Sequence, residues 1–170
     1  MTTCTSTVPT PVGDLRLAVD VGPDGERLVA LAFADHFDRV AAPVRRRHPG
    51  DWTEAETGVT DAVRRYVAGE VDALDELDVE VEGSPFRRQV WDALRRIPVG
   101  TTWSYRDLAA AVGSPGAVRA VGSANGANPV WLVVPCHRVV RSDGTLGGYG
   151  GGLDRKAWLL AHERAGGHTA

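Results

Sequence analysis

Apolar residues in the first part of the chain take every second position in short runs, a period of two that is typical of half-buried strands. Turn residues separate these runs, as at positions 10–13 and 23–25. Apolar residues recur at helical spacing between Val59 and Val67, and Gly69 supplies a stop signal. The polar segment 35–53 carries two prolines, which predicts a loop with a short helix at most. The predicted strands are residues 15–19, 28–33 and 77–81.

From Gly83 onward the pattern becomes mainly helical. Ser84 is a suitable N-cap and Pro85 suits the first helical position, so a helix is expected up to about Ile97. The end of the chain is expected to hold a buried strand at 130–134, a glycine-rich loop at 144–152, a helix that starts after Asp154 and a disordered tail from Gly166.

Two short helices with a glycine turn between them follow the first helix. Ser104 caps one, and Ser114-Pro115 opens the other, which ends near Asn125. This is the form of a helix-turn-helix, although the pattern by itself favours an ordinary helical hairpin. The exposed positions of the later helix are mostly Ala, Gly and Ser, whereas reading the major groove requires long polar side chains. Small residues with one long side chain, Arg119, suit the minor groove better.

The charge of the chain is divided unevenly between its two parts. The net charge of the 170 residues is −3, but residues 1–83 hold eight basic residues against 17 acidic ones, a net −9. Residues 84–170 hold 11 basic residues against five acidic ones, a net +6. This asymmetry indicates a polyanionic partner for the second part, with a merely solvated basic face as the open alternative. We therefore expect an α+β protein with two domains, residues 1–83 and residues 84–170.

Composition excludes several classes of protein and of site. No apolar run approaches the roughly 20 residues that a membrane span needs, and the N-terminus lacks the features of a secretory signal. Two cysteines, Cys4 and Cys136, cannot form a disulfide framework, which favours a reducing compartment and thus the cytoplasm. No ligand pairs stand at metal spacing, so no zinc or other metal is expected. The glycine-rich loop lacks the Lys-Ser/Thr of a phosphate-binding loop.

Cys136 and His137 form the candidate chemical group. A neighbouring histidine suggests an activated thiolate, because a free thiol with a pKa of roughly 8.5 is mostly protonated at neutral pH. In a strand the two side chains would point to opposite faces, so their contact requires a turn, which Pro135 favours, or a bridging water. The alternative for Cys136 is a buried structural thiol, which is the commoner fate of a lone cysteine.

The segment from Asn128 to Val139, Asn-Pro-Val-Trp-Leu-Val-Val-Pro-Cys-His-Arg-Val, resembles the active-site block of O6-alkylguanine-DNA alkyltransferases. The resemblance covers about residues 84–164, while the N-terminal part is similar only in size, strand content and turn placement. It implies a small ribonuclease-H-like α/β domain, followed by a mostly helical, winged-helix-like domain with a DNA-binding helix-turn-helix. The flanking motifs that agree are Ser104-Tyr105, Arg119-Ala120-Val121-Gly122, Gly147 to Gly152 and Ala161-His162-Glu163.

The resemblance implies direct-reversal DNA repair, in which one alkyl group moves irreversibly from O6-alkylguanine in duplex DNA to Cys136. The damaged base would be flipped out through the minor groove. No cofactor is implied, a monomer is expected, and activity on O4-alkylthymine and cooperative binding to DNA stay open. The implied catalytic residues are Cys136 as nucleophile and acceptor, His137 as its base through a water, Glu163 as the residue that orients His137, Asn128 as the brace of the turn, and Tyr105 as a hydrogen-bond donor to the guanine ring.

The resemblance also implies positions that bind the base and the DNA. The backbone at Cys136 and Val139 would read the guanine amino group, while Tyr149 and the Gly150 amide would close over the alkylated oxygen. Some relatives carry Ser at position 150, and the substitution changes little if the amide does the work. On DNA, Arg119 would fill the place of the flipped base, Ala120 and Gly122 would allow close approach, and Arg106, Ser114 and Ser142 would contact phosphates.

Three other functions share part of this pattern. A non-catalytic alkyltransferase-like protein that marks damaged bases would replace the nucleophile, whereas this chain keeps Cys136. A helix-turn-helix regulator would carry a polar recognition helix and would have no use for the Pro-Cys-His-Arg block. A cysteine hydrolase would turn over and would not need a basic half.

Overall fold

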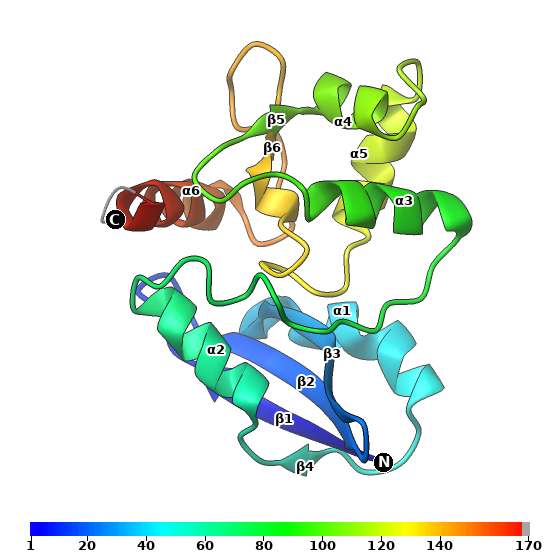
Figure 1. Ribbon diagram of the computed structural model, residues 1–170, viewed down its shortest axis with the longest axis vertical. Coiled ribbons are helices and arrows are strands. Elements are labelled where there is room, and N and C mark those ends of the chain that lie inside the picture. The colour runs from blue at the N-terminus through cyan, green and yellow to red at the C-terminus, as the bar shows by residue number, and fades with distance from the viewer. Residues whose placement is uncertain (168–170) are drawn as a thin grey trace. The chain divides into compact units, whose positions relative to one another are not determined.

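The computed structural model describes residues 1–167, and contacts within the chain divide it into two compact units. The first comprises Met1–Val81 together with the short segment Pro129–Trp131, and the second comprises Glu82–Asn128 and Leu132–Ala170. Strands and helices occur together, so the chain is a mixed α+β protein, as the sequence predicts (Figure 1). Within the described residues, no helix combines the length and the apolar character that crossing a membrane requires.

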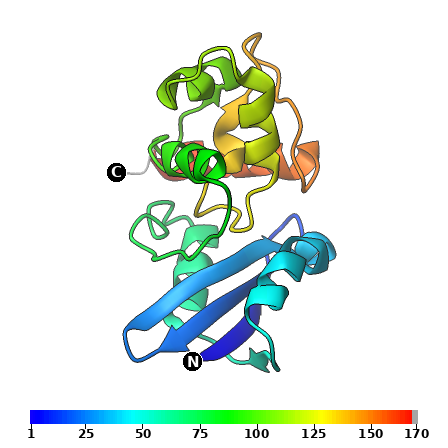
Figure 2. The same ribbon diagram turned by 90° about the vertical axis from the view of Figure 1, so that its right-hand side faces the viewer.

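The first unit is built on a four-stranded sheet in the order β3-β2-β1-β4. β1 and β2 pair antiparallel, as do β2 and β3, whereas β4 pairs parallel to β1. Figure 2 shows the three long strands side by side. The elements of this unit are β1 (Thr2–Val8), β2 (Leu15–Gly22), β3 (Gly25–Phe33), α1 (Ala34–Arg47), β4 (Thr53–Glu54) and α2 (Gly58–Val67).

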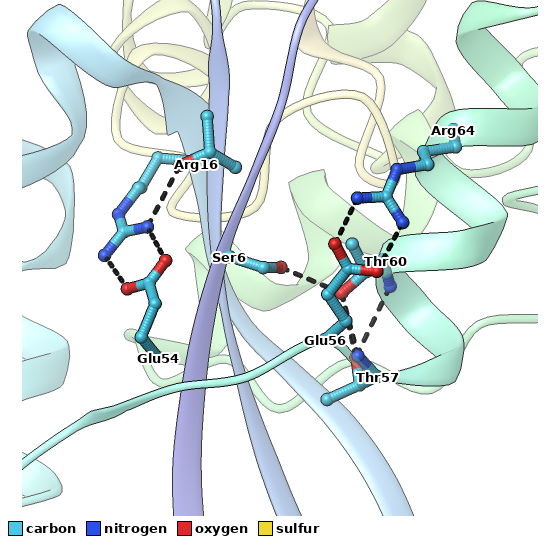
Figure 3. A network of polar contacts seen from close by, with 8 residues as sticks. Ser6, Arg16, Glu54, Glu56, Thr57, Thr60 and Arg64 are labelled. Atoms are coloured by element: carbon cyan, nitrogen blue, oxygen red, sulfur yellow. Dashed lines mark hydrogen bonds and ion pairs between the residues drawn. The ribbon is translucent and has the colours of Figure 1, made fainter.

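A polar network ties β4 and α2 to the long strands (Figure 3). The Arg16 guanidinium on β2 donates two hydrogen bonds of 2.7 Å to the Glu54 carboxylate on β4, across the intervening strand β1. These bonds lower the pKa of Glu54 to about 2. The Ser6 hydroxyl on β1 lies 2.8 Å from the Thr60 hydroxyl, and Thr60 forms a reciprocal capping box with Thr57 at the start of α2.

The outer edge of β3 is covered by two single-residue bridges. Residues 28–33 are all buried, which means that both faces of this strand are covered. At its edge, Leu28 forms a bridge with Val79, and Leu31 forms another with Val130. The second bridge draws the segment Pro129–Trp131 into the first unit, directly before the residues that lead to Cys136.

The second unit is mainly helical. Ser84 accepts a hydrogen bond from the Arg87 amide at the start of α3, and Ser104 forms a capping box with Asp107 at the start of α4, both at the predicted N-caps. β5 pairs with β6 in parallel, which places Ser104 opposite Val140. The elements are α3 (Pro85–Leu94), β5 (Trp103–Ser104), α4 (Tyr105–Ala111), α5 (Val118–Gly126), a 3-10 turn η1 (Cys136–Arg138), β6 (Val139–Val140) and α6 (Leu153–Gly167).

Two predictions about the first unit are wrong. The segment 35–53 is predicted as a loop with a short helix at most, but the 14-residue helix α1 fills most of it, because Phe37, Ala41 and Val44 form one buried stripe that outweighs the proline inside the helix. Residues 77–81 were expected as a strand, but they make only the bridge at Val79. In addition, no element was predicted for β1, whose Thr- and Ser-rich sequence hides the alternation in burial.

Three predictions about the second unit also need correction. Residues 130–134 are buried as expected, but Val130 makes only a single bridge, residues 131–134 form turns and a bend, and Leu132 has a φ of 73°. Helix α5 starts at Val118 and not after Ser114, because the Ala117 amide bonds to the Ser114 carbonyl at 2.8 Å in a separate turn. Helix α6 starts two residues early and continues through Gly167, so the expected disordered tail does not begin at Gly166; residues 168–170 lie outside the described residues.

Candidate active site

Cys136 lies on a tight turn that hydrogen bonds hold from both sides. The Cys136 amide donates to the Val134 carbonyl at 2.8 Å, and the Arg138 amide donates to the Pro135 carbonyl at 3.0 Å. The side-chain amide of Asn128 donates to the same Val134 carbonyl at 2.7 Å. The turn that the adjacency of Cys136 and His137 requires is therefore present, and a buried asparagine braces it.

His137, Glu163 and Arg138 form a buried cluster of ion pairs and hydrogen bonds next to Cys136 in the chain. The Nε2 atom of His137 lies 2.8 Å from Oε2 of Glu163, and both side chains have 0% exposure. Arg138 donates to both carboxylate oxygens, from Nε at 2.8 Å and from Nη2 at 3.0 Å. Its Nη1 atom donates to the Ile97 carbonyl at 2.8 Å. Glu163 on α6 thus fixes the orientation of the imidazole, and Arg138 fixes Glu163.

The charges of this cluster keep Glu163 ionised. Burial alone raises the pKa of Glu163, but the electrostatic effect of His137 and the hydrogen bonds from His137 and Arg138 outweigh it, so the pKa is held far below its usual value. The other ring nitrogen of His137, Nδ1, is buried and has no hydrogen-bond partner among the described residues. A buried polar atom of this kind is a position that an ordered water satisfies.

The surroundings of Cys136 disfavour ionisation of its thiol. Burial raises its pKa to about 11, against smaller opposing effects of a hydrogen bond from Asn128 and the positive charge of Lys156. The thiol is therefore protonated at neutral pH. Attack by its sulfur requires a base that removes the proton as the reaction proceeds.

Tyr105, the first residue of α4, lies between α5 and the glycine-rich loop. A Cβ atom built on Gly122 of α5 would lie 3.9 Å from the ring, and one on Gly147 of the loop would lie 3.3 Å from Cε2. Burial, and at high pH the negative charge of ionised Cys136, raise the pKa of Tyr105, so its hydroxyl is protonated at neutral pH. The structure thus brings Tyr105 against the loop and close enough to the nucleophile for their charges to interact.

Lys156 on α6 holds the glycine-rich loop from inside. Its side chain has 0% exposure, and its ammonium group donates hydrogen bonds to the carbonyls of Val139, Leu146 and Gly148. Burial lowers its pKa to about 8, so the group is still charged at neutral pH. Three donors on one compact group match three converging carbonyls, a geometry that the planar fork of arginine does not offer.

The remaining predicted residues fall into two groups. Val139 is buried, and Tyr149 is half-buried with a pKa that burial, and at high pH the charge of ionised Cys136, raise far above its usual value. The others lie at or near the surface of α4, of α5 and of the loops that follow α4 and β6. These are Arg106, Ser114, Arg119, Ala120, Gly122, Ser142 and Gly150.

Sequence reasoning missed three residues of the site. Arg138 carried no signal beyond its place in the motif, and Asn125, whose side-chain amide donates to the Cys136 carbonyl at 3.4 Å, lies outside the motifs. Lys156 did carry one, since it is the single lysine among 19 basic residues, and a chain that otherwise uses arginine keeps lysine where a compact ammonium group is needed.

A second polar cluster lies in the first unit, away from the thiol in sequence. The Nδ1 atom of His48 lies 2.9 Å from Oδ2 of Asp20, and its Nε2 atom lies 3.5 Å from Oε1 of Glu80. These three side chains offer atoms that can bind a metal ion. Each ring nitrogen of His48 thus faces a different carboxylate.

Comparison with known proteins places this site in a family. Residues 85–165 match the family described as 6-O-methylguanine DNA methyltransferase, DNA binding domain. A methylated-DNA–protein-cysteine methyltransferase of Salmonella typhimurium is 45% identical over 161 residues, which cover 92% of each chain. The chain belongs to the methylated-DNA–protein-cysteine methyltransferase family. A family member from Mycolicibacterium paratuberculosis is 46% identical over 161 residues, 93% of this chain and 90% of its own.

Solved structures of family members have the same fold. The crystal structure of Mycobacterium tuberculosis OGT in complex with DNA matches with a TM-score of 0.79 and 36% identity, over 96% of this chain and 94% of that one. The O6-methylguanine-DNA methyltransferase of Pyrococcus kodakaraensis matches with a TM-score of 0.74 and 27% identity, over 95% and 98%. The likeness extends through the N-terminal unit, which the sequence motifs did not cover.

Proposed function

We propose that this chain repairs DNA by direct reversal and transfers the alkyl group of O6-alkylguanine in duplex DNA to Cys136. The sulfur of Cys136 attacks the alkyl carbon, a carbon–sulfur bond forms, and the bond from that carbon to O6 of guanine breaks. The product is a thioether, which water does not readily cleave, so each molecule acts once. The buried series Cys136, His137 and Glu163 carries this proposal, because it supplies a nucleophile, a base and a group that orients the base.

In this mechanism the Cys136 thiol loses its proton as its sulfur gains the alkyl group. The thiol proton passes to His137 through the water that its Nδ1 atom would bind, and Glu163 stabilises the imidazolium that forms. The Tyr105 hydroxyl, which its raised pKa keeps protonated, donates to the guanine ring and stabilises the base as it leaves. Asn128 keeps the turn in place, and the thiol faces the alkyl carbon in line.

The DNA would approach the surface formed by α4, α5 and the loop after β6. The base is stacked inside the duplex, so it must be flipped out before the sulfur can reach it. Arg119 is exposed on α5 and would fill the vacated place, while Ala120 and Gly122 permit close approach to the minor groove. Arg106, Ser114 and Ser142 would contact phosphates, and Tyr149 with Gly150 would close over the alkylated oxygen.

We further propose that residues 84–170 form the alkyltransferase and DNA-binding domain and residues 1–83 a supporting domain. The protein would act in the cytoplasm, as a monomer and without a cofactor. The domain assignment rests on the position of every proposed reacting group after residue 83 and on the charge of the two parts.

A labelled-methyl experiment tests the function. Duplex DNA with O6-[³H-methyl]guanine is incubated with excess DNA over protein, and label on protein is counted. Transfer should plateau at about one methyl per protein and be absent in Cys136→Ala, with Cys4→Ala as the matched control that retains it. Release of free methanol, or label on the Cys136→Ala protein, would contradict the proposal.

A second experiment tests base flipping by Arg119. Arg119→Ala should slow transfer from duplex DNA at least tenfold more than transfer from free O6-methylguanine base, because only the duplex requires a wedge. Arg46→Ala, in the first unit, serves as the control. Equal losses on both substrates would show that Arg119 does not act on the stacked base.

A further inference from the structure

Asn125 is a buried polar residue for which the mechanism above has no use. It lies near the end of α5 and is 7% exposed. Its Nδ2 atom donates a long hydrogen bond of 3.4 Å to the carbonyl of Cys136, the nucleophile. Its Oδ1 atom is buried and has no hydrogen-bond partner among the described residues.

The turn does not depend on this amide. The Cys136 carbonyl already accepts the Val139 backbone amide, and Asn128 braces the turn through the Val134 carbonyl. A buried acceptor without a partner costs stability, and an apolar side chain of the same size would avoid that cost. The orientation of the amide is fixed, because only its nitrogen can bond to a carbonyl, and the oxygen is therefore the unused end.

The position of Asn125 on α5 relates it to the proposed base-binding residues. Residues three apart on a helix share a face, so Asn125 lies on the same side of α5 as Gly122. The Tyr105 ring lies beside Gly122, as described above. Asn125 thus has the nucleophile's carbonyl on one side and, one turn along its helix, the tyrosine proposed to contact the guanine ring.

We infer that Asn125 is a specificity-determining residue that reads the exocyclic amine of the flipped guanine, an inference that rests on the proposed function. The Oδ1 atom accepts one N–H of the 2-amino group, while the other N–H is directed to the backbone carbonyl of Val139, because the Cys136 carbonyl already accepts two hydrogen bonds. An amine is the complement of an unused acceptor, whereas a base with hydrogen at that position leaves the acceptor unpaired. The residue therefore favours alkylated guanine over alkylated purines that lack the amine.

The test compares two substrates that differ only in the amine. Single-turnover rates are measured on duplexes with O6-methylguanine and with O6-methylhypoxanthine, which has hydrogen in place of the 2-amino group. The wild-type protein should prefer O6-methylguanine, and Asn125→Leu should reduce that preference about tenfold while the rate on O6-methylhypoxanthine stays within about threefold. Asn125→Asp keeps the acceptor, so it should keep the preference although its negative charge slows both reactions.

Equal slowing of both substrates in Asn125→Leu would overturn the inference, because it would mean that Asn125 only supports the turn. Ser123→Ala, an exposed change on the same helix, is the matched control and should leave both rates unchanged. If Asn125→Leu does not fold, the ratio of the rates on O6-methylguanine and O6-methylhypoxanthine in Asn125→Ala tests the inference instead. A wild-type protein that transfers no methyl group refutes the proposed function itself, whereas normal transfer with an unchanged ratio in the variants refutes only the role of Asn125.

Discussion

At the scale of single residues, the site combines a strong nucleophile with an environment that keeps it inactive. With a pKa of about 11, roughly one Cys136 thiol in ten thousand would be ionised at pH 7. A free thiolate is therefore not the resting state, and the protein avoids side reactions of an exposed anion. Because the proton must leave during attack, the position of His137 matters more than the equilibrium acidity of the sulfur.

The pH dependence of the reaction should reveal this arrangement. Without a base, the rate follows the thiolate fraction, which rises about tenfold per pH unit below pH 11 because the pKa of Cys136 is raised. His137→Gln should therefore show that slope between pH 7 and 9 with free O6-methylguanine base, and the wild-type protein a clearly shallower one. His162→Gln is the control. Parallel profiles of wild type and His137→Gln would mean that His137 does not take the proton.

Lys156 gives a second prediction at this scale. Lys156→Met removes the donor that three carbonyls share, so we expect the free energy of unfolding to fall by about 3 kcal/mol. The loop between β6 and α6 should exchange its amide hydrogens faster, as hydrogen-exchange mass spectrometry can measure. Arg164→Met, an exposed change on the same helix, is the control. Unchanged exchange in the loop would contradict a clamping role.

At the scale of elements, N-caps and turns position the site more than long helices do. The Ser104–Asp107 capping box fixes where α4 begins and thus where Tyr105 stands, with hydrogen bonds of 2.9 Å in both directions. β5 ends at Ser104 and pairs with β6 directly after the Cys136 turn. The start of α4 and the nucleophile are thereby joined through two short strands.

Removal of this cap should affect both stability and reaction. Ser104→Ala should lower the free energy of unfolding by about 1 kcal/mol and slow transfer, because the first turn of α4 loosens around Tyr105. Thr102→Ala, two residues earlier and exposed, is the control. Chemical denaturation measures the first effect and single-turnover kinetics the second. A destabilised variant that transfers the methyl group at the wild-type rate would show that the position of Tyr105 does not affect the reaction.

The elements also mark the limit of what the sequence could predict. Local signals placed the starts of α3 and α4 correctly, because a cap is decided by a few neighbouring residues. The run 130–134 was predicted as a buried strand because its residues are all apolar. An apolar run indicates burial, but burial does not specify the backbone conformation. Leu132 adopts a positive φ there, which only the surrounding fold imposes. The cysteine and histidine were predicted from motif, whereas Asn125, Arg138 and Lys156 act through contacts between distant segments.

At the scale of the whole molecule, the charge division changes once burial is considered. Arg138, Lys156 and Glu163 are buried, so nine basic and four acidic residues of positions 84–170 remain at or near the surface, a net +5. This positive charge attracts a polyanionic partner at distances shorter than the screening length of the salt solution. The residues proposed to contact phosphates nevertheless include only one charged side chain, since two of the three are serines.

Binding to duplex DNA should therefore depend on salt concentration less strongly than is usual for DNA-binding proteins. With one or two phosphates neutralised, a fourfold rise in salt concentration should weaken binding by about 3- to 12-fold. Arg106→Ala should reduce the slope of log affinity against log salt by about 0.9, whereas Arg46→Ala should leave it unchanged. Fluorescence anisotropy with a labelled duplex measures both. A slope several times steeper would mean that arginines outside α4 and α5 contact the backbone, and an unchanged slope in Arg106→Ala would remove that residue from the phosphate contacts.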